Sequence, residues 1–299
     1  MSRIHEAMRR AEQERLSDIS PLVQVTTNSR TAGNGGSART SRAHADFYEE
    51  LAPPSLPSSG GCLHFDEVQA RCARPTWTID AKSSAFSPMN HPAAGAEQFR
   101  TLRSRLYRLR EKRKLQTLLV TSATAAEGKS YVASNLAQAF ARQQGRRVLL
   151  VDADLRCPQL HVRLGAPTSP GLSDYLQGKA TEMSIVQHGS KDGLYFIPAG
   201  VRVSDPSELV SSDRLKVLFA RMTPAFDWTV IDVPPVLPAS DASTLAELCD
   251  GVLLVVRAAH TPFAAAQKAC TEFRDRNLVG LVLNYAEEGG AYAGDSYYP

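Results

Sequence analysis

Short apolar runs alternate with helical segments along the last two thirds of the chain, and this alternation constrains the fold more than any other feature. Runs that are almost entirely apolar are typical of strands buried on both faces of a parallel sheet. Helices between such strands supply the covering layers. The sequence therefore predicts an α/β fold with a doubly wound, mostly parallel sheet and helices on both faces. The expected strands lie at 115–122, 146–154, 194–200, 228–235, 251–258 and 278–285, and the expected helices at 96–114, 129–143, 207–222, 240–248 and 262–276.

The first 90 of the 299 residues have a different composition. Residues 1–16 predict a short amphipathic helix, with Ile4 and Met8 on one stripe among charged residues. Residues 17–90 are rich in Ser, Gly, Pro and Ala, as in the run TAGNGGSARTS, and predict a flexible, low-complexity linker. We therefore expect a disordered N-terminal region, a folded domain over 91–285, and a mobile tail with tyrosines over 286–299.

Composition and patterning exclude several classes of protein. No window approaches the roughly 18 apolar residues that a membrane span needs. The N-terminus is charged and lacks an apolar core, so we expect a cytoplasmic location. Five cysteines form no CxxC pair and seven histidines form no HxxxH pair, which argues against a disulfide framework and a nitrogen-bound metal. A net charge of +3 is too small to indicate a nucleic-acid partner.

The strongest local signal is a glycine-containing loop between an expected strand and an expected helix, with the sequence ATAAEGKS. It fits a phosphate loop that has Ala in place of the first Gly. In such loops the backbone N–H groups and the helix N-terminus face the phosphates, the Lys reaches the β and γ phosphates, and the Ser ligates Mg²⁺. The candidate nucleotide-binding residues are Ala123, Thr124, Ala125, Ala126, Glu127, Gly128, Lys129 and Ser130.

Acidic residues end two of the expected strands. Asp152 and Asp154 follow one apolar run, and Asp232 ends another. Side chains at i and i+2 of a strand point the same way, so both carboxylates can meet at the carboxyl edge of the sheet, where open α/β sheets bind ligands. Carboxylates near Mg²⁺ can hold the metal and accept a proton from an attacking hydroxyl. We expect Lys129, Asp152 and Asp154 to be catalytic, and Ser130, Asp152 and Asp232 to hold Mg²⁺ beside ATP.

Several segments recur in the order typical of one family: EQFRTLRSRL, TSATAAEGKS, VLLVDADLRCPQLH and FDWTVIDVPPVLPASDA. Over about residues 96–285 the chain resembles the bacterial tyrosine kinases (BY-kinases) of the CpsD/CapB type, which accompany capsule and exopolysaccharide synthesis. The resemblance implies a P-loop NTPase fold like that of MinD and ParA. It also implies that residues 123–130 are the Walker A loop, that Asp152 and Asp154 belong to Walker A′, and that Asp232 belongs to Walker B.

The same resemblance implies an autokinase that works in trans. Glu97, Arg100 and Arg103 match the ExxRxxR helix through which the family assembles into rings. A transmembrane polysaccharide co-polymerase would be the activator and would hold the chain at the inner membrane. The expected phosphate acceptors are the tail tyrosines Tyr292, Tyr297 and Tyr298.

Two other functions remain open from the residues alone. A MinD/ParA-type ATPase switch shares the fold, but such switches usually carry a second Lys directly after the first loop position, where this chain has Thr124. A nonenzymatic adaptor would leave the intact Lys129 and its carboxylates unexplained. The loop also departs from the family at Ala125 and Ala126, where Pro and Gly are usual. The basic run 100–114 has an apolar stripe, which favours a packed helix with a solvated or inter-subunit face over a nucleic-acid or lipid site.

Overall fold

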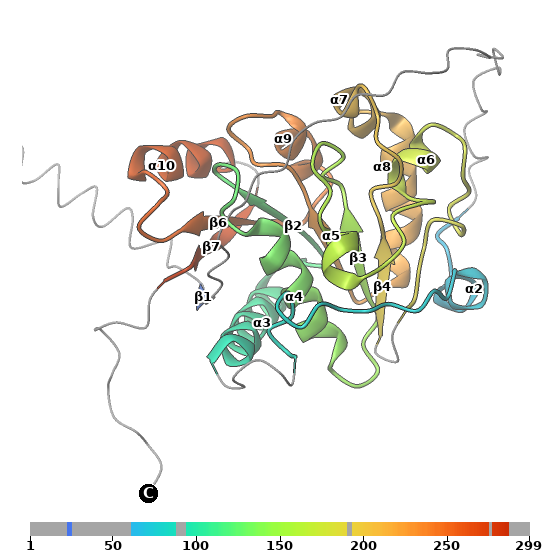
Figure 1. Ribbon diagram of the computed structural model, residues 1–299, viewed down its shortest axis with the longest axis horizontal. Helices are drawn as coiled ribbons and strands as arrows, with labels where there is room; N and C mark the ends of the chain where they lie inside the picture. The colour runs from blue at the N-terminus through green and yellow to red at the C-terminus, as the bar shows by residue number, and fades with distance from the viewer. Residues whose placement is uncertain (1–22, 26–60, 88–93, 190–192, 275–276, 287–299) are drawn as a thin grey trace, which may run out of the picture.

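A computed structural model describes residues 23–25, 61–87, 94–189, 193–274 and 277–286. The described strands form one parallel sheet in the order β1-β7-β6-β2-β5-β3-β4 (Figure 1). The chain runs outward from β2 to one side, returns at β5, and then builds the other side, so β2 lies where the winding changes direction. The strands are β1 (Val23–Val25), β2 (Thr117–Ser122), β3 (Val148–Asp152), β4 (Leu194–Ile197), β5 (Trp228–Asp232), β6 (Gly251–Arg257) and β7 (Leu278–Asn284).

Helices cover both faces of the sheet because the central strands are apolar on both sides. Leu118 and Val120 of β2 pack into one core, and Leu119 between them packs into the other. The first core includes residues of α3 (Ala94–Lys112) and α4 (Lys129–Ala141), and the second includes residues of α8 (Asp213–Met222), α9 (Asp241–Ala246) and α10 (Phe263–Glu272). The shorter helices are α2 (Phe65–Arg71), α5 (Leu160–Leu164), α6 (Leu172–Leu176), α7 (Pro206–Val210) and η1 (Thr223–Ala225).

The predicted fold class is confirmed, and each expected strand is present. The helix expected over 207–222 is two helices, because Ser212 adopts an extended backbone between α7 and α8. The helix expected over 1–16 and nearly all of the expected tail lie outside the described residues. Within the part of the chain that the structure describes, no helix is both long enough and apolar enough to cross a membrane.

Residues 61–87, which the sequence assigned to a flexible linker, instead pack along the domain as a strap. The strap begins on the α8 side of the sheet, where Phe65 meets Tyr195 and Phe226 edge-on at centroid distances of 5.4 and 6.0 Å. It then passes β4 and reaches the α4 side, where Ser84 donates a hydrogen bond of 2.9 Å to Gln138 (Figure 1). The linker prediction therefore does not hold for this stretch, nor for residues 23–25, which pair with β7 as strand β1.

Gln187 and the strap together cover the edge of the sheet at β4. Phe196 of β4 exchanges backbone hydrogen bonds of 2.8 Å with Gln187, and Ala73 of the strap forms a bridge to the same residue. Trp77 of the strap then packs edge-on against Phe196 at 6.0 Å. Because an open edge strand invites pairing with other chains, this cover has a clear physical purpose. The sequence did not predict the strap, because its contacts are long-range and follow no helical or strand period.

Candidate active site

The loop 123–128 joins β2 to α4 at the carboxyl edge of the sheet. Gly128 immediately precedes α4 and has φ 92°, a left-handed conformation that a side chain would strain. A Cβ atom there would also lie 2.0 Å from the side-chain nitrogen of Asn284. Both constraints require glycine at this position, so the backbone can lead directly into the helix N-terminus that phosphate binding uses.

Ala126 adopts a left-handed backbone in the same loop, with φ 63°. A non-glycine residue in this region costs roughly 1 kcal/mol because its Cβ crowds the following carbonyl oxygen. Ala126 is one of two loop positions, with Ala123, at which this sequence has alanine where glycine is usual. The loop therefore keeps its shape at a conformational cost.

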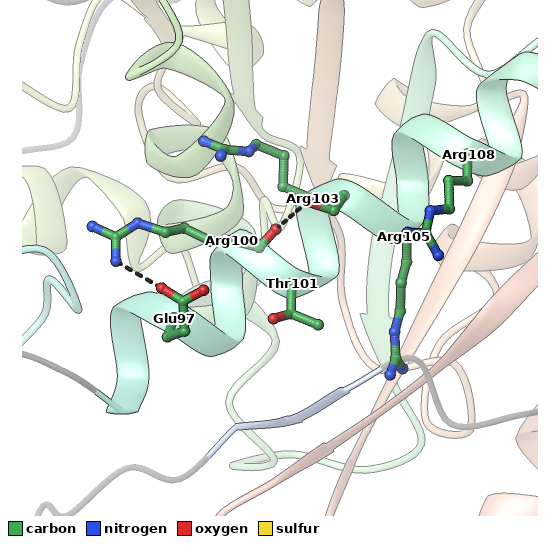
Figure 2. Close-up of a pocket in the computed structure, with 7 residues that line it drawn as sticks. Glu97, Arg100, Thr101, Arg103, Arg105 and Arg108 are labelled. Carbon is green, nitrogen blue, oxygen red and sulfur yellow. Dashed lines mark hydrogen bonds and ion pairs between the residues drawn. The ribbon is translucent and has the colours of Figure 1, made fainter. Parts of the chain in front are cut away.

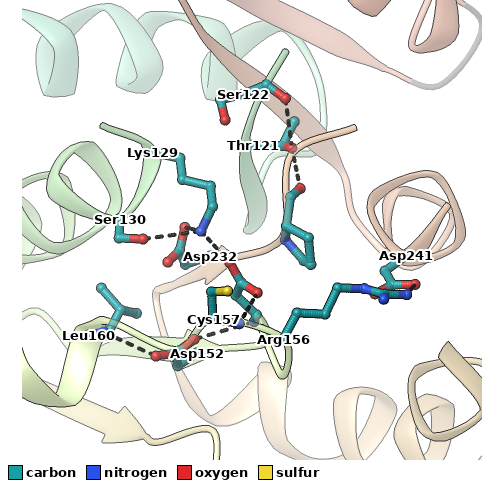
Figure 3. A network of polar contacts seen from close by, with 12 residues as sticks. Thr121, Ser122, Lys129, Ser130, Asp152, Arg156, Cys157, Leu160, Asp232 and Asp241 are labelled. Atoms are coloured by element: carbon teal, nitrogen blue, oxygen red, sulfur yellow. Dashed lines mark hydrogen bonds and ion pairs between the residues drawn. The ribbon is translucent and has the colours of Figure 1, made fainter. Parts of the chain in front are cut away.

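Lys129 and three carboxylates meet at the ends of β3 and β5 (Figure 3). The Lys129 Nζ atom lies 2.6 Å from Asp154 Oδ2 and 3.5 Å from Asp232 Oδ1, and it lies 3.2 Å from Ser130 Oγ. Asp152 and Asp232 are register partners on adjacent parallel strands, which explains why they lie together. The structure thus brings together the predicted catalytic and metal-binding residues.

Each carboxylate has its own surroundings. Asp152 accepts backbone N–H bonds from Leu160 at 3.0 Å and from Asp154 at 3.3 Å. Asp154 accepts the backbone N–H of Cys157 at 2.9 Å, which leaves its other oxygen to Lys129. The carboxyl group on β3 is therefore fixed by the backbone, and the carboxyl group two residues later holds the lysine.

Burial and crowding shift the pKa values in this cluster. Burial, together with the nearby Asp232, raises the pKa of Asp152 to about 8. Burial also raises the pKa of Asp232, although Lys129 opposes the shift. Burial alone would lower the pKa of Lys129, but the charges of Asp232 and Asp154 outweigh it and raise the pKa. Lys129 therefore stays charged, while the carboxyl groups of Asp152 and Asp232 hold on to protons at unusually high pH.

The oxygen atoms of Ser130, Asp152 and Asp232 suit an Mg²⁺ ion that has few protein ligands. Asp232 is fully buried, and its Oδ2 atom has no hydrogen-bond partner among the described residues. A buried carboxylate oxygen without a partner is costly unless a cation or donor meets it. No group of three or more His, Cys, Asp or Glu side chains in the described residues could by itself hold a metal ion. Mg²⁺ commonly binds through one or two protein groups, with phosphates and water as the remaining ligands.

Two residues at this site, Thr261 and Asn284, were not predicted from the sequence. Thr261, from the β6–α10 connection, donates a hydrogen bond to the fully buried side chain of Glu127 in the predicted loop. Asn284, at the end of β7, donates a 2.8 Å hydrogen bond from its side chain to the Glu127 carbonyl oxygen. A polar residue ending an apolar strand is the signal that could have indicated Asn284, as it did for Asp232. Thr261 lies in the segment VVRAAHTP, which is also similar to the family, and this is the signal that could have indicated it.

The residues predicted for assembly lie on α3 and line a groove of about 450 Å³ (Figure 2). Arg100 pairs with Glu97 at 2.9 Å within the same helix, and both side chains are exposed. Arg103 instead donates a 2.7 Å hydrogen bond to the Ala139 carbonyl oxygen at the end of α4. The structure therefore brings Glu97 and Arg100 together and directs Arg103 to another helix. The groove is lined by Glu97, Arg100, Thr101, Arg103, Ser104, Arg105 and Arg108.

The fold and the site together define a nucleotide-binding protein of the P-loop class. Residues 118–289 match the family described as the CobQ/CobB/MinD/ParA nucleotide binding domain. The chain is 37% identical over 191 residues to the tyrosine-protein kinase YwqD of Bacillus subtilis (strain 168), covering 63% of this chain and 80% of YwqD. It is 30% identical over 209 residues to the putative tyrosine-protein kinase CapB of Staphylococcus aureus, covering 68% of this chain and 91% of CapB.

Solved structures agree with these relatives. The kinase domain of the Escherichia coli tyrosine kinase ETK matches with a TM-score of 0.68 and 25% identity, over 96% of this chain and 98% of that domain. The chain spans only 24% of the full-length Etk of Escherichia coli (strain K12), to which it is 35% identical over 177 residues. The chain belongs to the bacterial tyrosine kinases. The relatives' names favour the kinase interpretation over the ATPase switch.

The strain at Ala126 generates a test of the loop geometry. Ala126→Gly relieves the left-handed strain, so we expect the free energy of unfolding to stay level or rise by up to about 1 kcal/mol. Ala125→Gly is the matched control, because Ala125 is not among the residues with positive φ, and it should lower the free energy of unfolding by roughly 0.5–1 kcal/mol. Urea denaturation measures both. Equal destabilisation by the two substitutions would contradict the assigned backbone.

Proposed function

We propose that the chain is an ATP-dependent protein tyrosine autokinase that regulates the synthesis and export of exopolysaccharide. The observation that carries the proposal is the position of Lys129. It lies at the start of the phosphate-loop helix, within 2.6 Å of Asp154 and 3.5 Å of Asp232. An ammonium group beside the phosphate loop suits phosphoryl transfer, because this reaction depends mainly on positioning and charge stabilisation. The family to which the chain belongs supports tyrosine as the acceptor.

We assign each side chain of the site a separate role in phosphoryl transfer. The loop N–H groups and Lys129 bind the phosphates of ATP, with Lys129 leaving Asp154 for the β and γ phosphates. Ser130, Asp152 and Asp232 would hold Mg²⁺, which would neutralise charge on the phosphates. The phenolic oxygen of a tyrosine attacks the γ phosphorus, and the bond between this phosphorus and the β–γ bridging oxygen breaks, which releases ADP. The phenol proton passes to a carboxylate. We assign this last task to the ionised Asp152, which lies in register with Asp232 at the carboxyl edge of the sheet.

Replacement of the lysine tests the site. Lys129→Met removes the cation from the phosphates, and loss of one preorganised charge stabiliser costs about 10² to 10³ in rate. We expect phosphotyrosine to nearly vanish from protein purified after co-expression with a transmembrane polysaccharide co-polymerase. The exposed Lys268 provides the matched control, Lys268→Met, which should keep full phosphorylation. Unchanged autophosphorylation in Lys129→Met would refute the assignment, and ATP hydrolysis without phosphotyrosine in the wild type would support the ATPase alternative.

The acceptors are proposed to be the tail tyrosines, Tyr292, Tyr297 and Tyr298, delivered to a neighbouring subunit. Tyr285 is not among the proposed acceptors, and the Arg257 guanidinium lies 4.5 Å from its ring centroid. We expect the triple substitution of the tail tyrosines by Phe to remove most phosphotyrosine, because it removes the three phenol groups proposed as acceptors. Tyr48→Phe is the control and should change little. Phosphopeptide mapping that finds phosphate only before Tyr285 would exclude the tail.

Assembly into a ring is proposed to use Glu97 and Arg100, whose side chains are exposed on α3. Opposite charges repeated head to tail close into a ring when the rotation allows it. Arg100→Ala with Arg103→Ala should lower the mass measured by light scattering for the unphosphorylated, nucleotide-bound protein. Arg103→Ala alone separates assembly from the hydrogen bond to Ala139. Arg71→Ala is the matched control, because it removes a similar exposed pair, with Glu67, on α2. An unchanged mass in the double variant would contradict the proposal and would indicate that these residues form a solvated surface.

A further inference from the structure

An anionic residue stands in the middle of the loop that is proposed to bind phosphates. A free carboxylate at Glu127 would repel a nucleotide's phosphate groups, since like charges a few ångströms apart are unfavourable even near a protein surface. In the structure the Glu127 side chain is fully buried. The position of this carboxylate therefore bears directly on how the loop can bind an anion.

Three donors hold the Glu127 carboxylate in place. The Thr124 backbone N–H donates to Oε2 at 2.9 Å, and the Thr124 hydroxyl donates to Oε1 at 3.0 Å. The third donor, the Thr261 hydroxyl, also bonds to Oε1. Two donors come from within the loop, whereas Thr261 lies 134 residues further along the chain, in the connection between β6 and α10. Thr261 is thus the donor that ties the loop to a separate part of the fold.

The proton of the Thr261 hydroxyl has a defined direction. The Arg257 backbone N–H donates to Thr261 Oγ1 at 2.8 Å, so this oxygen already acts as an acceptor. A hydroxyl carries a single proton, which here goes to the Glu127 carboxylate. Hydrogen bonds to a charged group are about twice as strong as neutral ones. The chain of bonds from Arg257 through Thr261 to Glu127 is therefore polarised toward the carboxylate.

A second bond from the same region holds the backbone of Glu127. The Asn284 side chain donates to the Glu127 carbonyl oxygen at 2.8 Å, and Asn284 is fully buried. The backbone carbonyl oxygen of Asn284 in turn accepts a hydrogen bond of 2.8 Å from the backbone N–H of Ala258. The end of β7 and the β6–α10 connection therefore fix both the carbonyl and the carboxylate of Glu127.

We propose that Thr261 is a positioning residue for phosphate binding, which acts by holding the Glu127 carboxylate beneath the loop and away from the nucleotide. The inference rests on the proposed ATP site and goes beyond it. With the hydroxyl in place, the negative charge is satisfied by donors and the loop N–H groups remain available to phosphate oxygens. Without it, Glu127 loses a donor, and its charge competes with the phosphates for the loop.

Binding of Mg·ATP to the full-length chain tests the proposal. Thr261→Val removes the hydroxyl at nearly constant volume and should weaken binding about tenfold, since a hydrogen bond to a charged group is at stake. Thr261→Ser restores the hydroxyl and should stay within about twofold of the wild type. Thr271→Val on α10 is the matched control, because Thr271 is exposed and its hydroxyl donates to the Gln267 carbonyl oxygen of its own helix. Calorimetry gives the affinities, and circular dichroism with thermal unfolding shows that each variant is folded.

The kinetic readout separates positioning from general stability. Thr261→Val should raise KM for ATP about tenfold while kcat changes by less than about threefold, because the defect concerns the binding of phosphates. A double-mutant cycle then tests the route through the carboxylate. In a Glu127→Gln background the same substitution should weaken binding by less than about threefold.

Three results would overturn the proposal: wild-type affinity in Thr261→Val, a failure of Thr261→Ser to restore binding, or a full tenfold loss in the Glu127→Gln background. Lys129→Met, measured beside these variants, keeps the two claims apart. If Lys129→Met binds ATP normally, the ATP site itself is wrong. If Lys129→Met loses binding but Thr261→Val does not, only the role of Thr261 fails.

Discussion

The ion cluster between Lys129 and the carboxylates of Asp154 and Asp232 is the interaction on which the site depends. The lysine side chain is 12% exposed and both partner carboxylates are less than 4% exposed. Charges this deep are tolerable only in compensated groups, because an unpaired buried ion costs several kcal/mol. Parallel pairing of β3 with β5 supplies two of the acidic positions, and the helix after β2 supplies the lysine. The sheet order therefore creates the charge cluster, and the cluster in turn constrains how the strand ends can be arranged.

Much of this could be predicted because the relevant signals are local. The apolar strands are recognised from a few residues each, and the carboxylates of Asp152 and Asp232 follow directly from where their strands end. The loop before Lys129 has a fixed spacing that relates residues only a few positions apart. Since parallel strands bring their carboxyl ends to one edge, these local signals were enough to predict that the site residues meet.

Other features depend on partners far away in the sequence and could not be predicted in this way. The strap packs because Phe65 and Trp77 find aromatic partners on β4 and near β5, and no period marks such single contacts. Thr261 is an ordinary polar residue until the fold brings it to Glu127. Arg103 matches an assembly motif by its spacing, yet the carbonyl oxygen at the end of α4 captures its guanidinium. In each case tertiary contacts decide the role of the residue.

The central claim is that this buried cluster receives Mg·ATP and releases Lys129 to the phosphates. A crystal structure with a nonhydrolysable ATP analogue and Mn²⁺, whose position is located by anomalous scattering, tests this claim most directly. The account predicts an anomalous peak within bonding distance of Ser130 Oγ and near Asp232, with Lys129 Nζ moved from Asp154 to the β and γ phosphates. A nucleotide bound elsewhere, with Lys129 still paired to Asp154 and no Mn²⁺ near Asp232, would contradict it.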